Sequence, residues 1–104
     1  MNKAVNCNSL EEVRANIDRL DRQIVGLLAE RGDYVKQAAR FKKTTADVKA
    51  PDRVEQVISK VVALSSEMGA SPTVTEAVYR AMISAFINAE LAEHAARSIS
   101  GDRP

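Results

Sequence analysis

Three basic residues, Arg14, Arg31 and Lys42, stand on a helical face that is otherwise largely apolar. Members of this face are separated alternately by three and four residues, the spacing that brings side chains onto one side of a helix. The row consists of Arg14, Ile17, Asp21, Ile24, Leu28, Arg31, Val35, Ala38 and Lys42. A buried cation is costly unless it has an anionic partner or a route to water. Arg31 and Lys42 could therefore snorkel to solvent, pair with acids of another helix or bind an anionic ligand.

Two further charged residues stand at unusual positions. Arg53 lies in the first turn of a predicted helix, where the helix dipole disfavours an exposed cation by a few tenths of a kcal/mol to about 1 kcal/mol. It could point outward, but an Arg beside a helix N-terminus also strengthens a site for an anion. Glu90 ends an apolar row that contains Tyr79, Ile83 and Phe86. Its carboxyl group is therefore exposed at an edge, ion-paired or functional.

The elements that position these residues are predicted to be three helices, with no sign of a strand. Ser9 and Glu12 have the spacing of a capping box, and helical periodicity continues from there to Lys42. The polar stretch 43–49 is predicted to be a loop. The remaining signals are Pro51 in the first turn of the second helix, Gly69 at its end, and Ser71 and Pro72 at the start of the third. We expect a helical domain over residues 9–97, between a flexible N-terminus (1–8) and a flexible tail (98–104).

The first helix is too long for a compact monomer. Over residues 10–42 it would extend roughly 50 Å at ~1.5 Å per residue, whereas a domain of this length has a radius of gyration of about 13 Å. Its apolar stripe would be exposed, and such a stripe marks an interface. Arg14 and Lys42 would stand about 42 Å apart on a straight helix, but an antiparallel copy could bring Arg14 alongside Arg31 and Lys42. The sequence therefore predicts an intertwined, symmetric homodimer.

Composition excludes several other classes of protein. The net charge of +1 over 104 residues gives no overall basic field for nucleic acid, and the cations of interest lie on an apolar face. The single cysteine, Cys7, cannot form an internal disulfide. The N-terminus lacks the apolar core of a secretory signal, and no stretch is long enough to span a membrane. We therefore expect a cytoplasmic protein that binds neither nucleic acid nor membranes.

The sequence resembles the all-α chorismate mutase family, and within it most closely the isochorismate pyruvate lyase branch. The likeness extends over roughly residues 8–95, and no single motif carries it. The matching segments are Val13-Arg14, Ile17-Asp18-Arg19-Leu20-Asp21, Glu30-Arg31, Asp33-Tyr34-Val35-Lys36, Ala39-Arg40-Phe41-Lys42 and Ala50-Pro51-Asp52-Arg53-Val54. The resemblance rests on Arg, Arg, Lys and Arg at these separations along long helices.

The resemblance implies a dimer whose first helices cross between subunits and form two equivalent sites for a small dicarboxylate. Arg14 would extend from the partner chain and hold one carboxylate, while Arg31 would hold the other. Lys42 would donate to the ether oxygen that joins the ring to the enolpyruvyl group, and Arg53 would support the polar end of the site. Glu90 falls where the family has a Gln or Glu that also contacts the ether oxygen. The apolar walls would be Val35, Ala38, Val57, Phe86 and Ile87.

The family includes two reactions that this site could catalyse. The [3,3] rearrangement of chorismate to prephenate requires no metal, nucleophile or redox cofactor, so we expect no cofactor. Glu90 favours this reaction, because the lyase branch has Gln there and some mutases have Glu. Val54 and the preceding segment 50–53 favour the lyase, which converts isochorismate to salicylate and pyruvate. In a familiar bacterial mutase, the position of Val54 holds an acid that contacts the ring hydroxyl.

We expect a chorismate mutase of aromatic amino-acid biosynthesis, with isochorismate pyruvate lyase as the alternative. An amino-chorismate is a further possible substrate. An alternative of another class is a non-catalytic helical dimer that binds a small aromatic acid. In such a module the four cations would be missing or already occupied. This sequence contains all four.

The role of Glu90 predicts a dependence of activity on pH. A carboxyl group donates a hydrogen bond to the ether oxygen only when it is protonated. Activity should therefore fall as the pH rises and Glu90 ionises, and Glu90→Gln should flatten the profile because an amide donates throughout. Measurements of kcat/KM from about pH 5 to 8 would check this, and a flat wild-type profile would contradict the assignment unless Glu90 stays protonated throughout that range.

Overall fold

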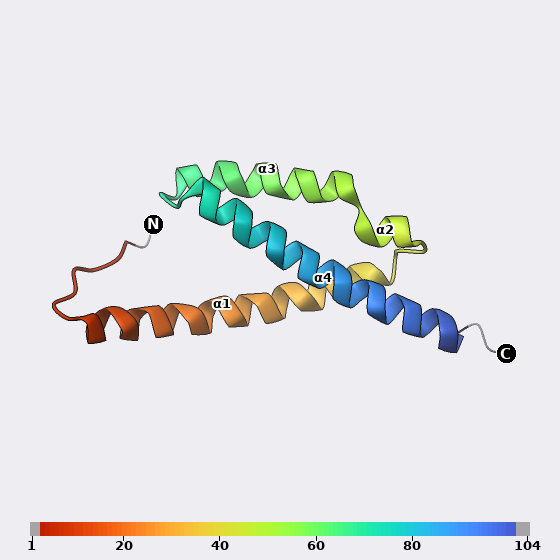
Figure 1. Ribbon diagram of the computed structural model, residues 1–104, viewed down its shortest axis with the longest axis horizontal. Helices are drawn as coiled ribbons and strands as arrows, with labels where there is room; N and C mark the ends of the chain where they lie inside the picture. Colours follow the sequence, from red (N-terminus) through yellow and green to blue (C-terminus); the bar gives the residue numbers. More distant parts are fainter. Residues whose placement is uncertain (1–2, 102–104) are drawn as a thin grey trace. The chain divides into compact units, whose positions relative to one another are not determined.

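The structure is a computed structural model that describes residues 3–101, with side chains over residues 3–96. Its elements are α1 (Leu10–Ala39), α2 (Thr45–Lys49), α3 (Pro51–Glu67) and α4 (Pro72–Gly101) (Figure 1). The described residues contain no strand, so the all-α class is confirmed. The very long first helix is confirmed as well, since α1 contains 30 residues. In the part of the chain that the structure describes, no helix is both long and apolar enough to cross a membrane.

The prediction of a loop over residues 43–49 is wrong, because α2 occupies most of this segment. Thr44 is the N-cap of α2, and its hydroxyl accepts a hydrogen bond from the backbone N–H of Asp47 at 3.0 Å. The Asp47 carboxylate in turn accepts from the backbone N–H groups of Lys43 and Thr44, at 3.0 and 3.1 Å. This capping box satisfies donors that the start of a helix leaves without partners. The polar composition that suggested a loop is therefore compatible with a short capped helix.

The chain forms two compact units, Met1–Val35 and Lys36–Pro104, so only the last turn of α1 belongs to the second unit.

In the first unit, the predicted capping box is present in a modified form. The Ser9 hydroxyl accepts from the N–H of Glu12 at 3.1 Å, and the Glu12 carboxylate accepts from the N–H of Asn8 at 2.9 Å. Residues 3–8, within the predicted flexible N-terminus, have no regular secondary structure.

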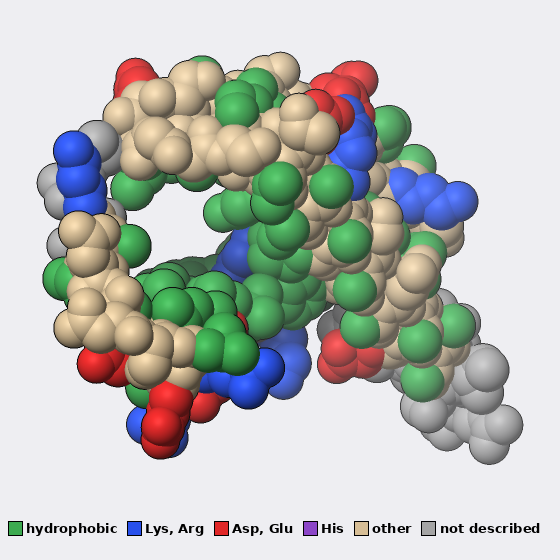
Figure 2. Space-filling view, turned by 60° about the vertical axis from the view of Figure 1, so that its left-hand side comes forward, with side chains coloured by type: hydrophobic (Ala, Val, Ile, Leu, Met, Phe, Trp, Pro, Cys, Tyr) green, Lys and Arg blue, Asp and Glu red, His purple; other side chains and the backbone are tan. Residues whose placement is uncertain are grey.

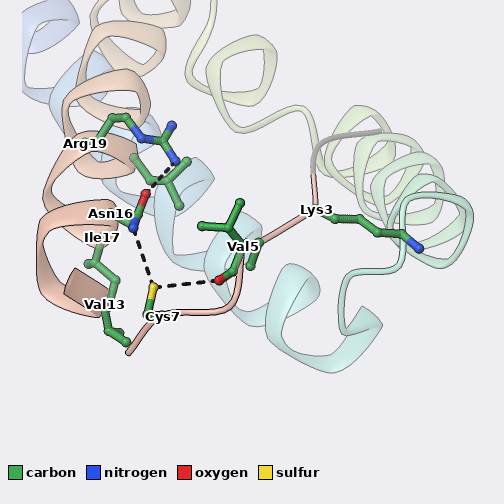
Figure 3. A pocket seen from close by; sticks show the side chains of 9 residues that line it. Lys3, Val5, Cys7, Val13, Asn16, Ile17 and Arg19 are labelled. Atoms are coloured by element: carbon green, nitrogen blue, oxygen red, sulfur yellow. Dashed lines mark hydrogen bonds between the residues drawn. The ribbon is translucent and has the colours of Figure 1, made fainter. Parts of the chain in front are cut away.

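The N-terminal segment lies against the first turns of α1 (Figure 3). The amide of Asn16 donates to the sulfur of Cys7 at 3.7 Å, and the Cys7 thiol donates to the carbonyl oxygen of Val5 at 3.7 Å. Together the segment and α1 line a small pocket. Its lining residues are Lys3, Ala4, Val5, Cys7, Val13, Asn16, Ile17, Arg19 and Leu20.

The apolar stripe of α1 is exposed along its length. Its exposed residues include Leu10, Val13, Ile17, Leu20, Ile24, Leu27 and Leu28, with exposed fractions between 37% and 65%. Hydrophobic side chains are correspondingly visible at the surface of the molecule (Figure 2). The buried apolar side chains among the described residues all lie in the second unit. An exposed apolar stripe of this length is typical of a surface that another protein chain covers.

The second unit is built on an antiparallel pair, α3 and α4, with α2 packed against α4. The turn between the pair is the one that the sequence predicts. Gly69 has a positive φ of 76°, and the N–H of Ala70 donates to the carbonyl of Ser65 at 2.8 Å, which closes α3 as in a Schellman motif. The Ser71 hydroxyl then accepts from the N–H of Val74 at 3.2 Å and caps α4.

The core of this unit is small and mostly aliphatic. Its buried apolar residues are Ala39, Val48, Ile58, Val61 and Ile83. On the exposed side of the pair, the guanidinium of Arg80 holds both carboxylate oxygens of Glu55 at 3.0 and 3.1 Å and that of Glu76 at 2.8 Å. Arg80 thereby lowers the pKa of the Glu55 carboxyl. Exposed ion pairs of this kind add little stability. The α3–α4 pair is therefore stabilised mainly by the apolar side chains buried between the two helices.

The helix α4 continues to Gly101, beyond residue 97, where the predicted helical domain ends. Residues 98–101, assigned to the predicted tail, are therefore helical. The rest of that tail, residues 102–104, lies outside the described residues, as do residues 1 and 2 at the other end.

Ser65 is a buried polar residue of α3 whose hydroxyl group lowers the stability of the fold. It is 4% exposed, and its hydroxyl has no hydrogen-bond partner among the described residues. Ser65→Ala should therefore raise the free energy of unfolding by about 1 kcal/mol, measured by urea denaturation at fixed protein concentration. Ser66→Ala, on an exposed side chain, is the matched control and should change stability by less than about 0.5 kcal/mol. A loss of stability in Ser65→Ala alone would show that the hydroxyl has a partner after all.

Candidate active site

The second unit contains a buried ion pair between Lys42 and Glu90. The Lys42 Nζ lies 3.1 Å from Glu90 Oε2 and donates a hydrogen bond to Glu90 Oε1 at 3.4 Å. The Glu90 side chain is only 6% exposed, whereas that of Lys42 is 25% exposed. Although Oε2 is the oxygen nearer to the ammonium group, it forms no hydrogen bond with good geometry within the described residues. The pair is therefore a desolvated carboxyl group whose cationic partner still contacts solvent.

Lys42 reaches Glu90 because the helical winding of α1 continues past Ala39. The backbone N–H groups of Arg40, Phe41 and Lys42 each donate to the carbonyl three residues earlier, at 3.0–3.2 Å. Such bonds tighten the last turn of a helix without ending its rotation. Lys42 therefore lies on a tightened helical turn that follows α1, immediately before the capping box of α2.

Glu90 lies in the middle of α4, seven residues after the buried Ile83, and so shares its face. This face is the apolar row, ending in a carboxyl group, that the sequence predicts. Of the alternatives considered for Glu90, exposure at an edge is excluded and an ion pair is confirmed. The predicted walls Val57, Phe86 and Ile87 are half-buried in the same unit.

The other three predicted cations lie on α1 and α3. Arg53 lies in the second unit, exposed in the first turn of α3. That helix begins at Pro51, directly after Ala50, whose φ of 35° turns the chain sharply between α2 and α3. Arg14 is exposed and Arg31 half-buried on the part of α1 that belongs to the first unit. The structure therefore brings Lys42 and Glu90 together and leaves the contacts of Arg14 and Arg31 with them as a prediction.

The two remaining wall residues lie near the end of α1. Val35 is half-buried and is the last residue of the first unit, whereas Ala38 is exposed in the second. Their place beside a substrate also stays a prediction.

The residues that shape the turn after Lys42 were not predicted from the sequence. Thr44 and Asp47 have the three-residue separation of an N-cap and its partner, a signal that the prediction of a loop overlooked. Lys42 and Glu90 were expected to contact the same ether oxygen, and an ion pair was an open alternative for each, but the two were not named as partners of one ion pair.

A cation held beside a buried carboxyl group can stabilise negative charge that develops on an oxygen atom of a ligand. The fold and this pair define a helical domain with a buried ion pair among mainly aliphatic buried residues. A sequence profile of the chorismate mutase type II family matches residues 13–91. The chain belongs to this family, which confirms the resemblance inferred from its sequence.

Two curated relatives indicate how broad the family's activities are. An isochorismate pyruvate lyase of Pseudomonas aeruginosa is 36% identical over 81 residues, which cover 78% of this chain and 80% of that enzyme. A bifunctional chorismate mutase/prephenate dehydratase of Aquifex aeolicus is 33% identical over 85 residues. The match covers 78% of this chain but only 24% of that enzyme.

The buried pair predicts an asymmetric effect of substitutions on stability. Lys42→Met should lower the free energy of unfolding by about 1–3 kcal/mol, because Glu90 remains buried without its charged partner. Adding Glu90→Gln to that variant should restore part of the loss, since an amide is less costly to bury than a charge. Urea unfolding at one protein concentration would measure both effects.

Lys43→Met is the control for this series, because the Lys43 side chain is exposed and adjacent in sequence. It should change stability by less than about 0.5 kcal/mol. Equal losses in Lys42→Met and Lys43→Met would contradict a stabilising ion pair at Glu90.

Proposed function

We propose that this protein is a chorismate mutase, which converts chorismate to prephenate by a [3,3] rearrangement. The observation that supports the proposal most directly is the ammonium group of Lys42, held 3.1 Å from the buried carboxyl group of Glu90. Membership of the chorismate mutase type II family supports the same class of reaction. The substrate in this proposal is a small dicarboxylate. The protein contributes cationic side chains that bind its oxygens and a site that holds it in the reactive conformation.

In the rearrangement, the C–O bond of the enolpyruvyl ether breaks while a C–C bond forms between the enolpyruvyl methylene carbon and the ring. The product is an isomer of the substrate, so no atom is gained or lost. Negative charge develops on the ether oxygen as the C–O bond lengthens, and Lys42 donates to that oxygen. The energy of this interaction grows toward the transition state, so it accelerates the reaction beyond simple binding.

The two carboxylates of the substrate are assigned to Arg14 and Arg31. An Arg side chain can hold a carboxylate with two parallel hydrogen bonds, which fixes its orientation as well as its position. Holding both ends of a flexible dicarboxylate selects the folded conformer in which the reacting carbons are close. Arg53, exposed in the first turn of α3, supports the polar end of the site.

Glu90 acts as the second donor to the ether oxygen when it carries a proton. Its Oε2 atom lies 3.1 Å from the Lys42 ammonium but forms no hydrogen bond with good geometry among the described residues, so it has capacity for a further partner. Val57, Phe86 and Ile87, which are half-buried, are assigned to the walls of the site. Apolar walls there would strengthen electrostatic interactions within it.

The second candidate is isochorismate pyruvate lyase. The relative of that name is 36% identical, and the match covers 80% of its length. In this reaction the ether C–O bond also breaks, but a ring hydrogen moves to the enolpyruvyl methylene carbon. The products, salicylate and pyruvate, together contain all the atoms of isochorismate. The same cations would hold either substrate. The ring hydroxyl is attached to different carbons in chorismate and isochorismate, so its recognition would decide between the two substrates.

The proposed site is completed by a second copy of the chain. The exposed apolar stripe of α1 requires a cover, and a straight helix separates Arg14 from Lys42 by about 42 Å. An antiparallel α1 from a partner would cover the stripe and bring the partner's Arg14 to the site. The result is an intertwined homodimer with two equivalent sites.

Product analysis tests the reaction directly. The purified protein would be incubated separately with chorismate and isochorismate, and prephenate, salicylate and pyruvate separated by chromatography. Prephenate from chorismate with little salicylate from isochorismate is the expected result. Rapid release of salicylate and pyruvate from isochorismate would establish the lyase instead. Absence of turnover would refute both and direct attention to an amino-chorismate or to a binding module without catalysis.

Complementation between variants tests the shared site. Arg14→Ala and Lys42→Ala should each be nearly inactive, yet a mixture unfolded and refolded together should recover activity. Random pairing makes about half of the dimers mixed, and each mixed dimer has one intact site, so roughly a quarter of wild-type activity is expected. Refolding each variant alone is the control. No recovery in the mixture would show that Arg14 and Lys42 act within one chain.

A further inference from the structure

The capping box that precedes α2 does more than begin a five-residue helix. A single oxygen of Asp47, Oδ2, accepts the backbone N–H groups of both Lys43 and Thr44, at 3.0 and 3.1 Å. These are the two residues that directly follow Lys42 in the chain. The carboxylate therefore fixes the path of the backbone as it leaves the candidate catalytic lysine.

On the other side of Lys42, the backbone is tied to α1. Its own N–H donates to the carbonyl of Ala39 at 3.2 Å, and Ala39 is buried, with 7% exposure. Lys42 thus stands between a buried anchor at the end of α1 and the Asp47 carboxylate. With both neighbouring segments held, only the side-chain rotations of Lys42 remain to place its ammonium group.

The anchor formed by Asp47 is itself attached to the helix that carries Glu90. Val48, the next residue, is 3% exposed and the most deeply buried apolar residue described, and α2 packs against α4. One continuous set of contacts therefore connects α4, α2, Asp47 and the backbone after Lys42. It ends where Lys42 Nζ meets Glu90, again on α4, at 3.1 Å.

We propose that Asp47 is a positioning residue that holds Lys42 against Glu90 through the backbone of Lys43 and Thr44. The inference rests on the proposed function for its effect on turnover, because Lys42 is the group that would meet the reacting oxygen. Asp47 contacts no part of the substrate in this proposal. Its carboxylate serves only to fix the turn from which Lys42 extends.

The charge of Asp47 suits this task. The backbone N–H groups of Lys43 and Thr44 hold the pKa of its carboxyl below the usual range. Lys42 contributes to the same lowering with its positive charge, although less than the two backbone donors. The group is therefore ionised at neutral pH, and hydrogen bonds to an ionised acceptor are shorter and stronger than those to a neutral one.

The test compares Asp47→Ala and Asp47→Asn with wild type, and uses Glu67→Ala as the matched control. Glu67 is an exposed acid at the end of α3, so its removal changes the net charge equally but leaves the turn intact. Asp47→Ala should lower kcat roughly 10-fold to 100-fold, the scale of a displaced catalytic group. KM should change little, because the substrate carboxylates are held by other residues.

Two further variants separate positioning from a general loss of structure. Asp47→Asn keeps an oxygen acceptor in place and should recover part of kcat. In the presence of Lys42→Met, adding Asp47→Ala should lower kcat no further, because the effect of Asp47 passes through Lys42. A further loss in that double variant, or a kcat for Asp47→Ala equal to that of Glu67→Ala, would overturn the proposal.

A spectroscopic measurement keeps the proposal testable even if no substrate is turned over. The 13C resonance of the Glu90 carboxyl group senses the ammonium group beside it. In Asp47→Ala it should move toward its position in Lys42→Met, whereas Glu67→Ala should leave it at the wild-type position. An unmoved Glu90 resonance in Asp47→Ala would refute the positioning role, whatever the outcome for the proposed reaction.

Discussion

The Glu90 carboxyl group is the constraint around which the second unit is arranged. At 6% exposure it has lost most of its contact with water, and the Lys42 ammonium lies 3.1 Å away. A buried carboxylate is tolerated only when a cation or hydrogen-bond donors replace the lost water. The structure therefore has to bring a lysine from the end of α1 to the middle of α4. The tightened last turn of α1 and the capped α2 both serve this requirement.

A buried ion pair of this kind contributes little net stability, because desolvation offsets most of its Coulombic energy. A pair of apolar residues at positions 42 and 90 would pack at least as well. The retention of two charges in an otherwise aliphatic region suits a chemical role better than a structural one. In the proposed reaction, the ether oxygen of the substrate would be a new partner for groups that are already partly desolvated.

Much of the fold was predictable because its signals are local. The period of the apolar residues predicted the helices, and Ser9, Gly69 and Ser71 correctly marked where they begin or end. The spacing of Thr44 and Asp47 was equally local, but the polar composition of residues 43–49 obscured it. Since a capping box satisfies the same backbone groups in any sequence context, its spacing was the better guide.

The candidate site was predictable only in part. Lys42 and Glu90 were identified as unusual by their apolar surroundings, but nothing in the sequence specifies contact between side chains 48 residues apart. That contact depends on how α2 and α4 pack, which no local pattern encodes. Arg14 and Arg31 belong to the other unit. Their roles continue to rest on the pattern of cations along α1 and on the family to which the chain belongs.

The most direct test of the central claim, that Lys42 stabilises the charge developing on the ether oxygen, is a binding measurement. A bicyclic ether dicarboxylate that mimics the folded transition state would be titrated calorimetrically into wild type, Lys42→Met and Lys43→Met. Wild type and Lys43→Met should bind it with equal affinity, and Lys42→Met at least about tenfold more weakly. Equal affinity in all three proteins would contradict the claim, because it would mean that the ammonium group of Lys42 does not meet the reacting oxygen.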